Sequence, residues 1–204
     1  MFQTVIIAGG LATRLWPETK TIPKSLINVS EKPFIDWQLT LLKEKGISEV
    51  LLCLGYLGEQ VEDFVGNGKK WNLNVSYSYE GEQLLGTGGA LRNALSKLND
   101  TFFITYGDSY LPIDYKNVLE SFKKSNEPAL MTVYKNNGLF DKSNVSIEKN
   151  KIKKYIKNSN DPDLVYIDYG LLVMSKDIIA KLPENETIDL AKPLQDLVEK
   201  GKLA

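Results

Sequence analysis

The sequence predicts an α/β fold, with a mainly parallel mixed β-sheet flanked by helices. Short apolar runs alternate along the chain with amphipathic segments, glycine-containing turns follow several of the runs, and hydrophobic residues make up 43% of the 204 residues. Strands that alternate with helical segments of roughly 10–15 residues are typical of βαβ units, whose strands run parallel. The chain length suits a single domain with a substantial core.

Expected strands and helices follow one another from end to end. Apolar or alternating runs predict strands at residues 4–8, 50–54, 73–79, 101–106, 129–134, 145–148, 152–156 and 165–174. Helical patterns lie at residues 33–45, 59–65, 88–98, 115–124 and 190–200. Pro33 suits the first turn of the helix that it opens, and Gly46 suits the end of that helix. Residues 149–151 form a short link between two of the strands and predict a hairpin there.

The balance of charge argues against a nucleic-acid-binding protein. The chain has 25 basic and 26 acidic residues and a formal net charge of −1, without the basic excess that binding to phosphate backbones requires. It also has no histidine, which excludes an imidazole base and a histidine metal ligand. We therefore expect the chemistry to use carboxylates, lysine, arginine and backbone amides.

One cysteine and the first residues of the chain bear on its location. Cys53 lies inside the apolar run 50–54, so we expect it to be buried, and a single cysteine has no intramolecular disulfide partner. This usage is typical of a reducing compartment. Residues 1–7 show neither a basic leader nor a long apolar stretch, so we predict no signal peptide, no membrane partner and a cytoplasmic location.

Three glycine turns that follow predicted strands carry the candidate chemistry. The first reads AGGLATRLWP at residues 8–17, with Pro23-Lys24 shortly after it. Adjacent glycines let backbone amides approach a ligand closely, and Arg14 and Lys24 can bind phosphate oxygens. An ordinary turn with surface cations is the alternative, but the whole array favours phosphate binding. The glycine spacing matches neither the Walker A loop nor the dinucleotide-binding motif.

The second turn reads QLLGTGGA at residues 83–90. Gln83 offers both a donor and an acceptor to the edge of a nucleotide base. Glycines at the start of a helix, Gly88 among them, offer backbone amides. A simple helix-opening loop is the alternative interpretation.

The third turn is Gly107-Asp108, directly after the apolar run 101–106. A carboxylate at a strand end is well placed to hold Mg²⁺ against a triphosphate, and an aspartate that only starts a turn is the alternative. Ligands of α/β sheets bind beyond the carboxyl ends of the strands. We therefore predict that the strands at 4–8, 50–54 and 101–106 are neighbours and that the three turns converge at one mouth.

Residues 8–26 resemble the signature of the sugar-phosphate nucleotidyltransferases, AGGxGTRLxPxTxxxPKxL, with Ala12 in place of the usual glycine as the clear departure. The second and third turns are similar to the family's base-reading loop, in the LGTGGA form common among heptose 1-phosphate guanylyltransferases, and to its metal-binding Gly-Asp element. The resemblance implies a Rossmann-like, GT-A-like nucleotidyltransferase fold. It implies nucleotide contacts from Ala8, Gly9, Gly10, Thr13, Gln83 and Gly88, catalytic roles for Arg14 and Lys24, and a Mg²⁺ ligand in Asp108.

The resemblance is weaker on the acceptor side. Family members often carry a Glu-Lys pair and an Asn-Ala-Gly turn that contact the sugar phosphate, and the corresponding stretches here are Lys157-Asn158 and Asp168-Tyr169-Gly170. Acceptor contacts are thereby implied for Gly107, Lys157, Asp168 and Gly170. The family's second metal carboxylate usually lies in a later Asp/Glu-Ile-Gly segment, which we do not find before Ala204. We expect that ligand either from a missing C-terminal segment or from elsewhere, with Asp168 as a candidate.

These features predict a one-domain enzyme, with a nucleotide-binding part at roughly residues 1–112 and an acceptor-binding part at roughly residues 113–204. In the expected reaction, a phosphate oxygen of a sugar 1-phosphate attacks the α-phosphorus of an NTP and pyrophosphate leaves. The nucleophile is already an anion near neutral pH, so no general base is needed. Arg14 and Lys24 would then act by positioning and by neutralising charge.

The nucleotide and the acceptor are less closely defined. The TRLWP and LGTGGA segments favour GTP, whereas CTP or UTP with another phosphorylated metabolite are alternatives. A glycosyltransferase is a rival, but it would carry Asp-x-Asp where this chain reads Asp108-Ser109-Tyr110. A nucleotide-binding regulatory homologue without turnover is the other rival. The expected partners are an NTP and a phosphorylated small molecule, with a homo-oligomer left open.

Overall fold

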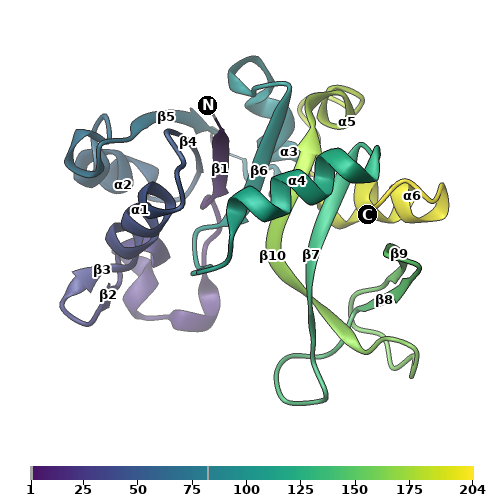
Figure 1. Cartoon of the computed structure of the whole chain (residues 1–204). Coiled ribbons are helices and arrows are strands. Elements are labelled where there is room, and N and C mark those ends of the chain that lie inside the picture. Colours follow the sequence, from purple (N-terminus) through teal and green to yellow (C-terminus); the bar gives the residue numbers. More distant parts are fainter. Residues whose placement is uncertain (1, 82) are drawn as a thin grey trace.

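The computed structural model describes residues 2–81 and 83–204, and its centre is a mixed eight-stranded sheet (Figure 1). The strand order is β5-β4-β1-β6-β10-β8-β9, and β7 also pairs with β10. The first four strands in this order run parallel, and β10 is antiparallel to β6, β7 and β8. The strands are β1 (Gln3–Ile7), β4 (Glu49–Leu54), β5 (Asn74–Tyr79), β6 (Thr101–Tyr106), β7 (Ala129–Lys135), β8 (Val145–Glu148), β9 (Lys151–Tyr155) and β10 (Tyr166–Ser175). The predicted fold class is confirmed.

Helices cover both faces of this sheet (Figure 1). They are α1 (Phe34–Glu44), α2 (Gly58–Val65), α3 (Gly86–Asn93), α4 (Tyr115–Ser125), α5 (Lys176–Ala180) and α6 (Ala191–Glu199). Side chains of β1 alternate between the faces, as a pleated strand requires. Val5 and Ile7 pack with residues of α3, α5 and α6, whereas Ile6 packs with residues of α1, α2 and α4. Two apolar layers therefore hold the sheet rigid from both sides.

The register of the parallel strands explains where the turns emerge. Ile7 of β1 pairs with Cys53 of β4 and with Tyr106 of β6, so the three strands end at the same level. The loops that follow them leave the sheet at one edge, which confirms the predicted adjacency of these strands. Cys53 is fully buried, as expected, and burial raises the pKa of its thiol to about 12.

Several local elements differ from the sequence-based expectation. The helix predicted at residues 88–98 begins earlier, at Gly86, and gives way after Asn93 to a short 3-10 helix, η5 (Leu95–Lys97), whose bonds span three residues instead of four. The short helix α5, the small sheet of β2 (Asn28–Val29) and β3 (Lys32–Pro33), and three 3-10 helices, η1 (Thr13–Leu15), η2 (Glu18–Lys20) and η3 (Lys24–Leu26), were not predicted. Such single turns leave no hydrophobic period in the sequence. Within the described parts of the chain, no helix is long and apolar enough to cross a membrane.

Candidate active site

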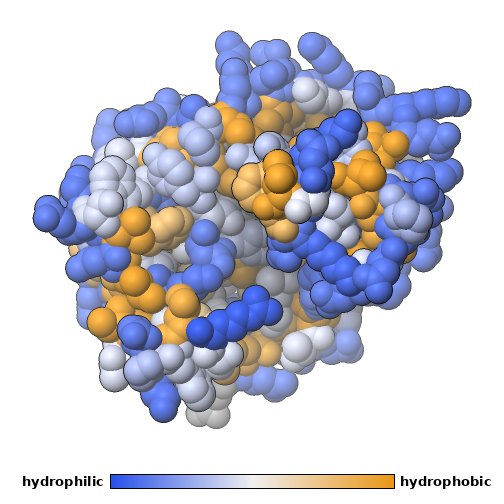
Figure 2. Space-filling view, turned by 90° about the horizontal axis from the view of Figure 1, so that it is seen from below, coloured by the Kyte–Doolittle hydropathy of each residue, from blue (hydrophilic) through white to orange (hydrophobic). Residues whose placement is uncertain are grey.

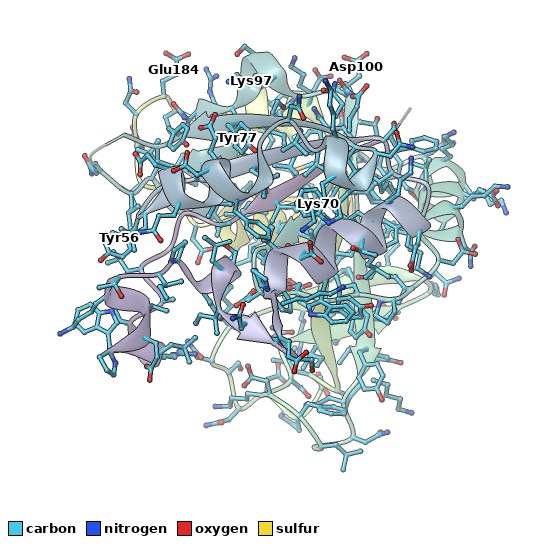
Figure 3. The ribbon with its side chains drawn as sticks, turned by 90° about the vertical axis from the view of Figure 1, so that its left-hand side faces the viewer. Tyr56, Lys70, Tyr77, Lys97, Asp100 and Glu184 are labelled. Atoms are coloured by element: carbon cyan, nitrogen blue, oxygen red, sulfur yellow. The ribbon has the colours of Figure 1, made fainter. Side chains whose placement is uncertain are left out.

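The glycine loop begins where β1 ends and is held against the neighbouring strand. Ala8 donates its N–H to the carbonyl oxygen of Cys53 at 2.9 Å, and the carbonyl of Gly9 accepts from Tyr56 N at 3.2 Å. The hydroxyl of Tyr56, a residue labelled beside this region in Figure 3, reaches the carbonyl of Lys20 at 2.7 Å. The loop is therefore fixed at both ends.

Glu80 explains why the first position of this loop is glycine. A Cβ added at Gly9 would lie 2.1 Å from Oε1 of Glu80. The other carboxylate oxygen of Glu80 accepts from the N–H of Leu85 at 2.6 Å, and burial raises the pKa of this carboxyl group. One side chain thus joins the glycine loop to the end of the loop before α3, at the N-cap residue Leu85. Glu80 was not predicted as a site residue, because nothing in its local sequence pattern shows what it contacts.

Lys24 and Asp108 meet across the mouth of the sheet. Lys24 lies on η3, and its Nζ is 2.5 Å from Oδ2 of Asp108. Both side chains remain about half exposed, at 41% and 48%. A cavity of about 380 Å³ lies here. Its lining includes Ala8, Gly10, Lys24, Thr87, Tyr106, Gly107 and Asp108. The predicted convergence of the first and third turns is therefore confirmed.

A second cavity of about 380 Å³ adjoins the first and shares Thr87 and Tyr106 with it. Its lining includes Tyr155, Lys157, Asp168, Tyr169, Gly170 and Asp189. The structure thus brings together three of the four residues expected on the acceptor side. The fourth, Gly107, lines the first cavity instead.

Asp168 lies at an irregularity in β10, where the pairing with β7 shifts register before Leu172. Its Oδ1 accepts from the N–H of Gly170 at 2.9 Å, and Gly170 has a φ of +89°. The Tyr155 hydroxyl lies 3.4 Å from the other oxygen. Burial raises the pKa of Asp168 more than these donors and Lys157 lower it. The site therefore holds a carboxylate where the family pattern usually has an amide.

Asp189 is a site residue that was not predicted from the sequence. Its carboxylate accepts two bonds from Nζ of Lys157, at 3.0 and 2.9 Å, and one from the N–H of Ala191 at 2.8 Å. Burial alone would raise its pKa, but Ala191, Lys157 and Thr87 together hold the pKa below its ordinary value. The sequence marks Asp189 only as an aspartate that follows an isoleucine just before the last amphipathic helix.

The charges of three carboxylates affect Tyr106, which, like Thr87, lines both cavities. Burial raises the pKa of its hydroxyl above the ordinary range, and the negative charges of Asp168, Asp189 and Asp108 raise it further. These aspartates come from β10, from the segment before α6 and from the turn after β6. Figure 2 looks at this edge of the sheet, where the surface is hollowed between hydrophilic side chains.

The second turn is arranged differently from the prediction. The N–H of Gly88 donates to the carbonyl oxygen of Ile188 at 2.7 Å, and a Cβ at Gly88 would lie 2.9 Å from the Ile188 side chain. This amide is therefore used inside the protein, and the expectation that it is free to contact a base was wrong. Gln83 is exposed, and its Nε2 lies 3.5 Å from the hydroxyl oxygen of Thr187.

Thr13 and Arg14 are not among the residues that line the two cavities. Both are exposed on η1, and Arg14 makes no hydrogen bond or ion pair with another residue in the described ranges. The loop before them turns at Ala12, which has a φ of +48° in the left-handed region, and whose carbonyl accepts from the Thr19 hydroxyl at 2.9 Å. The guanidinium therefore projects from a loop with a defined backbone path.

Comparison with known proteins identifies this arrangement. The family model described as nucleotidyl transferase matches residues 3–138, which include the glycine loop, Lys24 and Asp108. The chain belongs to this family. This nucleotidyltransferase is similar to curated relatives whose names describe transfer to sugar 1-phosphates.

Individual relatives differ in how much of the chain they match. A D-glycero-α-D-manno-heptose 1-phosphate guanylyltransferase of Campylobacter jejuni is 28% identical over 98% of this nucleotidyltransferase and 88% of its own length. An N-acetylmuramate α-1-phosphate uridylyltransferase of Neisseria meningitidis is 37% identical, but over 55% of this chain and 49% of its own. The crystal structure of HddC from Yersinia pseudotuberculosis complexed with GMP-PN has a TM-score of 0.74 and 28% identity, covering 93% of this chain and 85% of that one.

The carboxylates of the nucleotidyltransferase suit Mg²⁺ in company with a nucleotide. No group of three or more acidic or cysteine side chains in the described ranges forms a metal site by itself. Mg²⁺ is usually held by one or two carboxylates together with phosphate oxygens and water. Asp108 and Asp189 provide two partly exposed carboxylates, with side-chain exposures of 48% and 60%, and the two cavities that they line share Thr87 and Tyr106. This donor set fits a metal ion that arrives with a triphosphate.

Proposed function

We propose that this nucleotidyltransferase transfers GMP from GTP to a sugar 1-phosphate, releasing pyrophosphate and forming a nucleotide-activated sugar. The observation that carries the proposal is the similarity to a heptose 1-phosphate guanylyltransferase over almost the whole of both chains. The LGTGGA loop at residues 85–90 supports the same base, as does the likeness to a structure complexed with GMP-PN.

The geometry supports a division of labour between the two cavities. In the first, the glycine-loop amides and Arg14 would bind the triphosphate, and Lys24 would meet the charge that develops around the α-phosphorus. In the second, Lys157 would hold the acceptor phosphate, and Asp168 with Gly170 would face the sugar. An acceptor oxygen then attacks the α-phosphorus in line, the bond to the bridging oxygen breaks, and pyrophosphate leaves. The acceptor phosphate is already ionised, so the chain needs no general base.

We propose that Asp108 and Asp189 hold Mg²⁺ when the nucleotide is bound. Bound Mg²⁺ supplies positive charge that offsets the triphosphate. Asp189 is thus the proposed second carboxylate, in place of Asp168 or of a segment beyond Ala204. The cytoplasmic location predicted from the sequence also remains a proposal.

A uridylyltransferase is the second candidate, since the relative with that activity has the higher identity, 37%. A panel of GTP, UTP, CTP and ATP with Mg²⁺, assayed by pyrophosphate release with mannose-, glucose- and heptose 1-phosphates, separates the two. We expect the highest kcat/KM with GTP. A preference for UTP would refute the proposed base, and no release with any pair would favour a regulatory homologue. The variant Asp108→Asn serves as the inactive control.

A further inference from the structure

Gln38 is a buried side chain that has no assigned role in the proposed reaction. It lies on α1, is 2% exposed, and donates from Nε2 to the carbonyl oxygens of Tyr106 and Ser109, at 2.8 Å each. These carbonyls flank Gly107-Asp108, the turn that carries the proposed metal ligand. Two acceptors can be met only by the NH₂ end of an amide, so the orientation of the side chain follows from its partners.

The rest of the turn is already constrained, and Gln38 completes that constraint. Gly107 donates its N–H to Ile7 of β1 at 2.9 Å, and Ser109 donates to Tyr106 at 3.1 Å. Oε1 of Gln38 is buried without a hydrogen-bond partner in the described parts of the chain. An unpaired buried oxygen costs free energy. At the cost of this unpaired oxygen, Gln38 supplies two hydrogen bonds to the turn that an apolar side chain at this position could not supply.

Helix α1 is itself well anchored, so Gln38 is a rigid support. Asp36 of the same helix is buried and pairs with Lys70, which is labelled in Figure 3. At its start, Phe34 donates to the carbonyl of Ile27 at 3.0 Å, just after the 3-10 helix that carries Lys24. Both partners of the Lys24–Asp108 pair are therefore located with respect to α1.

We infer that Gln38 is a positioning residue that sets the carboxylate of Asp108 for Mg²⁺ and keeps it opposite Lys24. The inference rests on the proposed function, because it requires a metal at Asp108. Residues that orient a metal ligand typically change metal affinity by about 10- to 100-fold when removed. Gln38 reaches the ligand through the backbone, so we expect the lower end of that range.

The test compares Gln38→Met with Gln3→Met. Gln3 is a matched control, since it is 5% exposed and its amide also bonds two backbone groups, Lys97 O at 2.8 Å and Asn99 N at 2.9 Å, but at the opposite end of β1. Both variants should lose similar thermal stability. Binding of Mg²⁺ in the presence of a non-hydrolysable GTP analogue is measured by calorimetry, and binding of Mn²⁺ by electron paramagnetic resonance.

We expect the dissociation constant for the metal to rise about tenfold in Gln38→Met and less than twofold in Gln3→Met. Equal changes in the two variants would overturn the inference. Asp108→Asn distinguishes this failure from that of the proposed function. If Asp108→Asn leaves metal affinity unchanged, the proposed metal site is wrong; if it weakens binding while Gln38→Met does not, the role of Gln38 alone is wrong. Should Gln38→Met not fold, Gln38→Asn withdraws the amide by one methylene and is expected to weaken metal binding in the same direction, with unchanged affinity counting against the inference.

Discussion

Gly9→Ala tests whether Glu80 couples the glycine loop to the loop before α3. The new Cβ would lie 2.1 Å from Oε1 of Glu80, with the backbone nitrogen of Gly55 at 3.1 Å as the next obstacle. The carboxylate is the flexible end of a side chain, so it is the part expected to move. Moving it breaks the 2.6 Å bond from the N–H of Leu85. Loss of a hydrogen bond to a charged acceptor costs about 1.5–3 kcal/mol.

A double-mutant cycle turns this estimate into a sharper prediction. Glu80→Ala removes the same hydrogen bond and should also cost about 1.5–3 kcal/mol. In the double variant there is no clash with Glu80, and the hydrogen bond from Leu85 is lost only once. The combined loss should therefore stay close to that of one single variant, far below the sum of the two.

The free energy of unfolding, from urea denaturation, measures each corner of the cycle. Gly10→Ala is the control, because nothing lies within 4 Å of a Cβ there, and it should change stability by less than about 0.5 kcal/mol. Additive losses for Gly9→Ala and Glu80→Ala would show that Glu80 is not the obstacle and would refute the reasoning. Nucleotide affinity should fall in both single variants, since each releases the loop before α3.

Three further predictions concern single positions. Lys24→Ala should lower kcat on the order of 10²–10³ while nucleotide affinity changes much less, because a preorganised charge acts mainly in the transition state; weak binding with an unchanged kcat would contradict this role. Ala12→Gly should stabilise the protein by about 0.5 kcal/mol, since it relieves a left-handed alanine but adds entropy to the unfolded chain, and a loss above about 1 kcal/mol by denaturation would count against it. Asp168→Asn should be more stable than the natural protein at pH 7. Burial raises the folded-state pKa of Asp168. The contribution of this residue to protein stability is therefore fully present below the ordinary aspartate pKa of about 3.9, and it is lost as pH rises through the folded-state pKa. The advantage of the variant should therefore shrink toward pH 4, and a difference independent of pH would contradict the cause given.

The nucleotide half of the fold could be predicted because its signals are local. Apolar runs marked β1, β4 and β6, and the glycine loop with Lys24 and Asp108 could be located by pattern. The residues that hold the site together could not, since each acts across a long separation. Gln38 bonds residues 68 and 71 positions away, and Asp189 meets Lys157 at a separation of 32. Gly88 was misjudged for the same reason, because its amide is taken by Ile188, which only the folded chain brings near.

The two lysine–aspartate pairs suggest how the site accepts a highly charged substrate. Lys24 pairs with Asp108 at 2.5 Å in the first cavity, and Lys157 pairs with Asp189 at 2.9 Å in the second. All four side chains are at least 41% exposed, so each pair contributes little net stability and can be separated at low cost. Under the proposed function, each aspartate exchanges its lysine for the metal, and each lysine exchanges its aspartate for phosphate oxygens. The ammonium groups of Lys24 and Lys157 therefore lie close to the proposed positions of the triphosphate and the acceptor phosphate before either substrate binds. Such preorganisation reduces the rearrangement that catalysis requires.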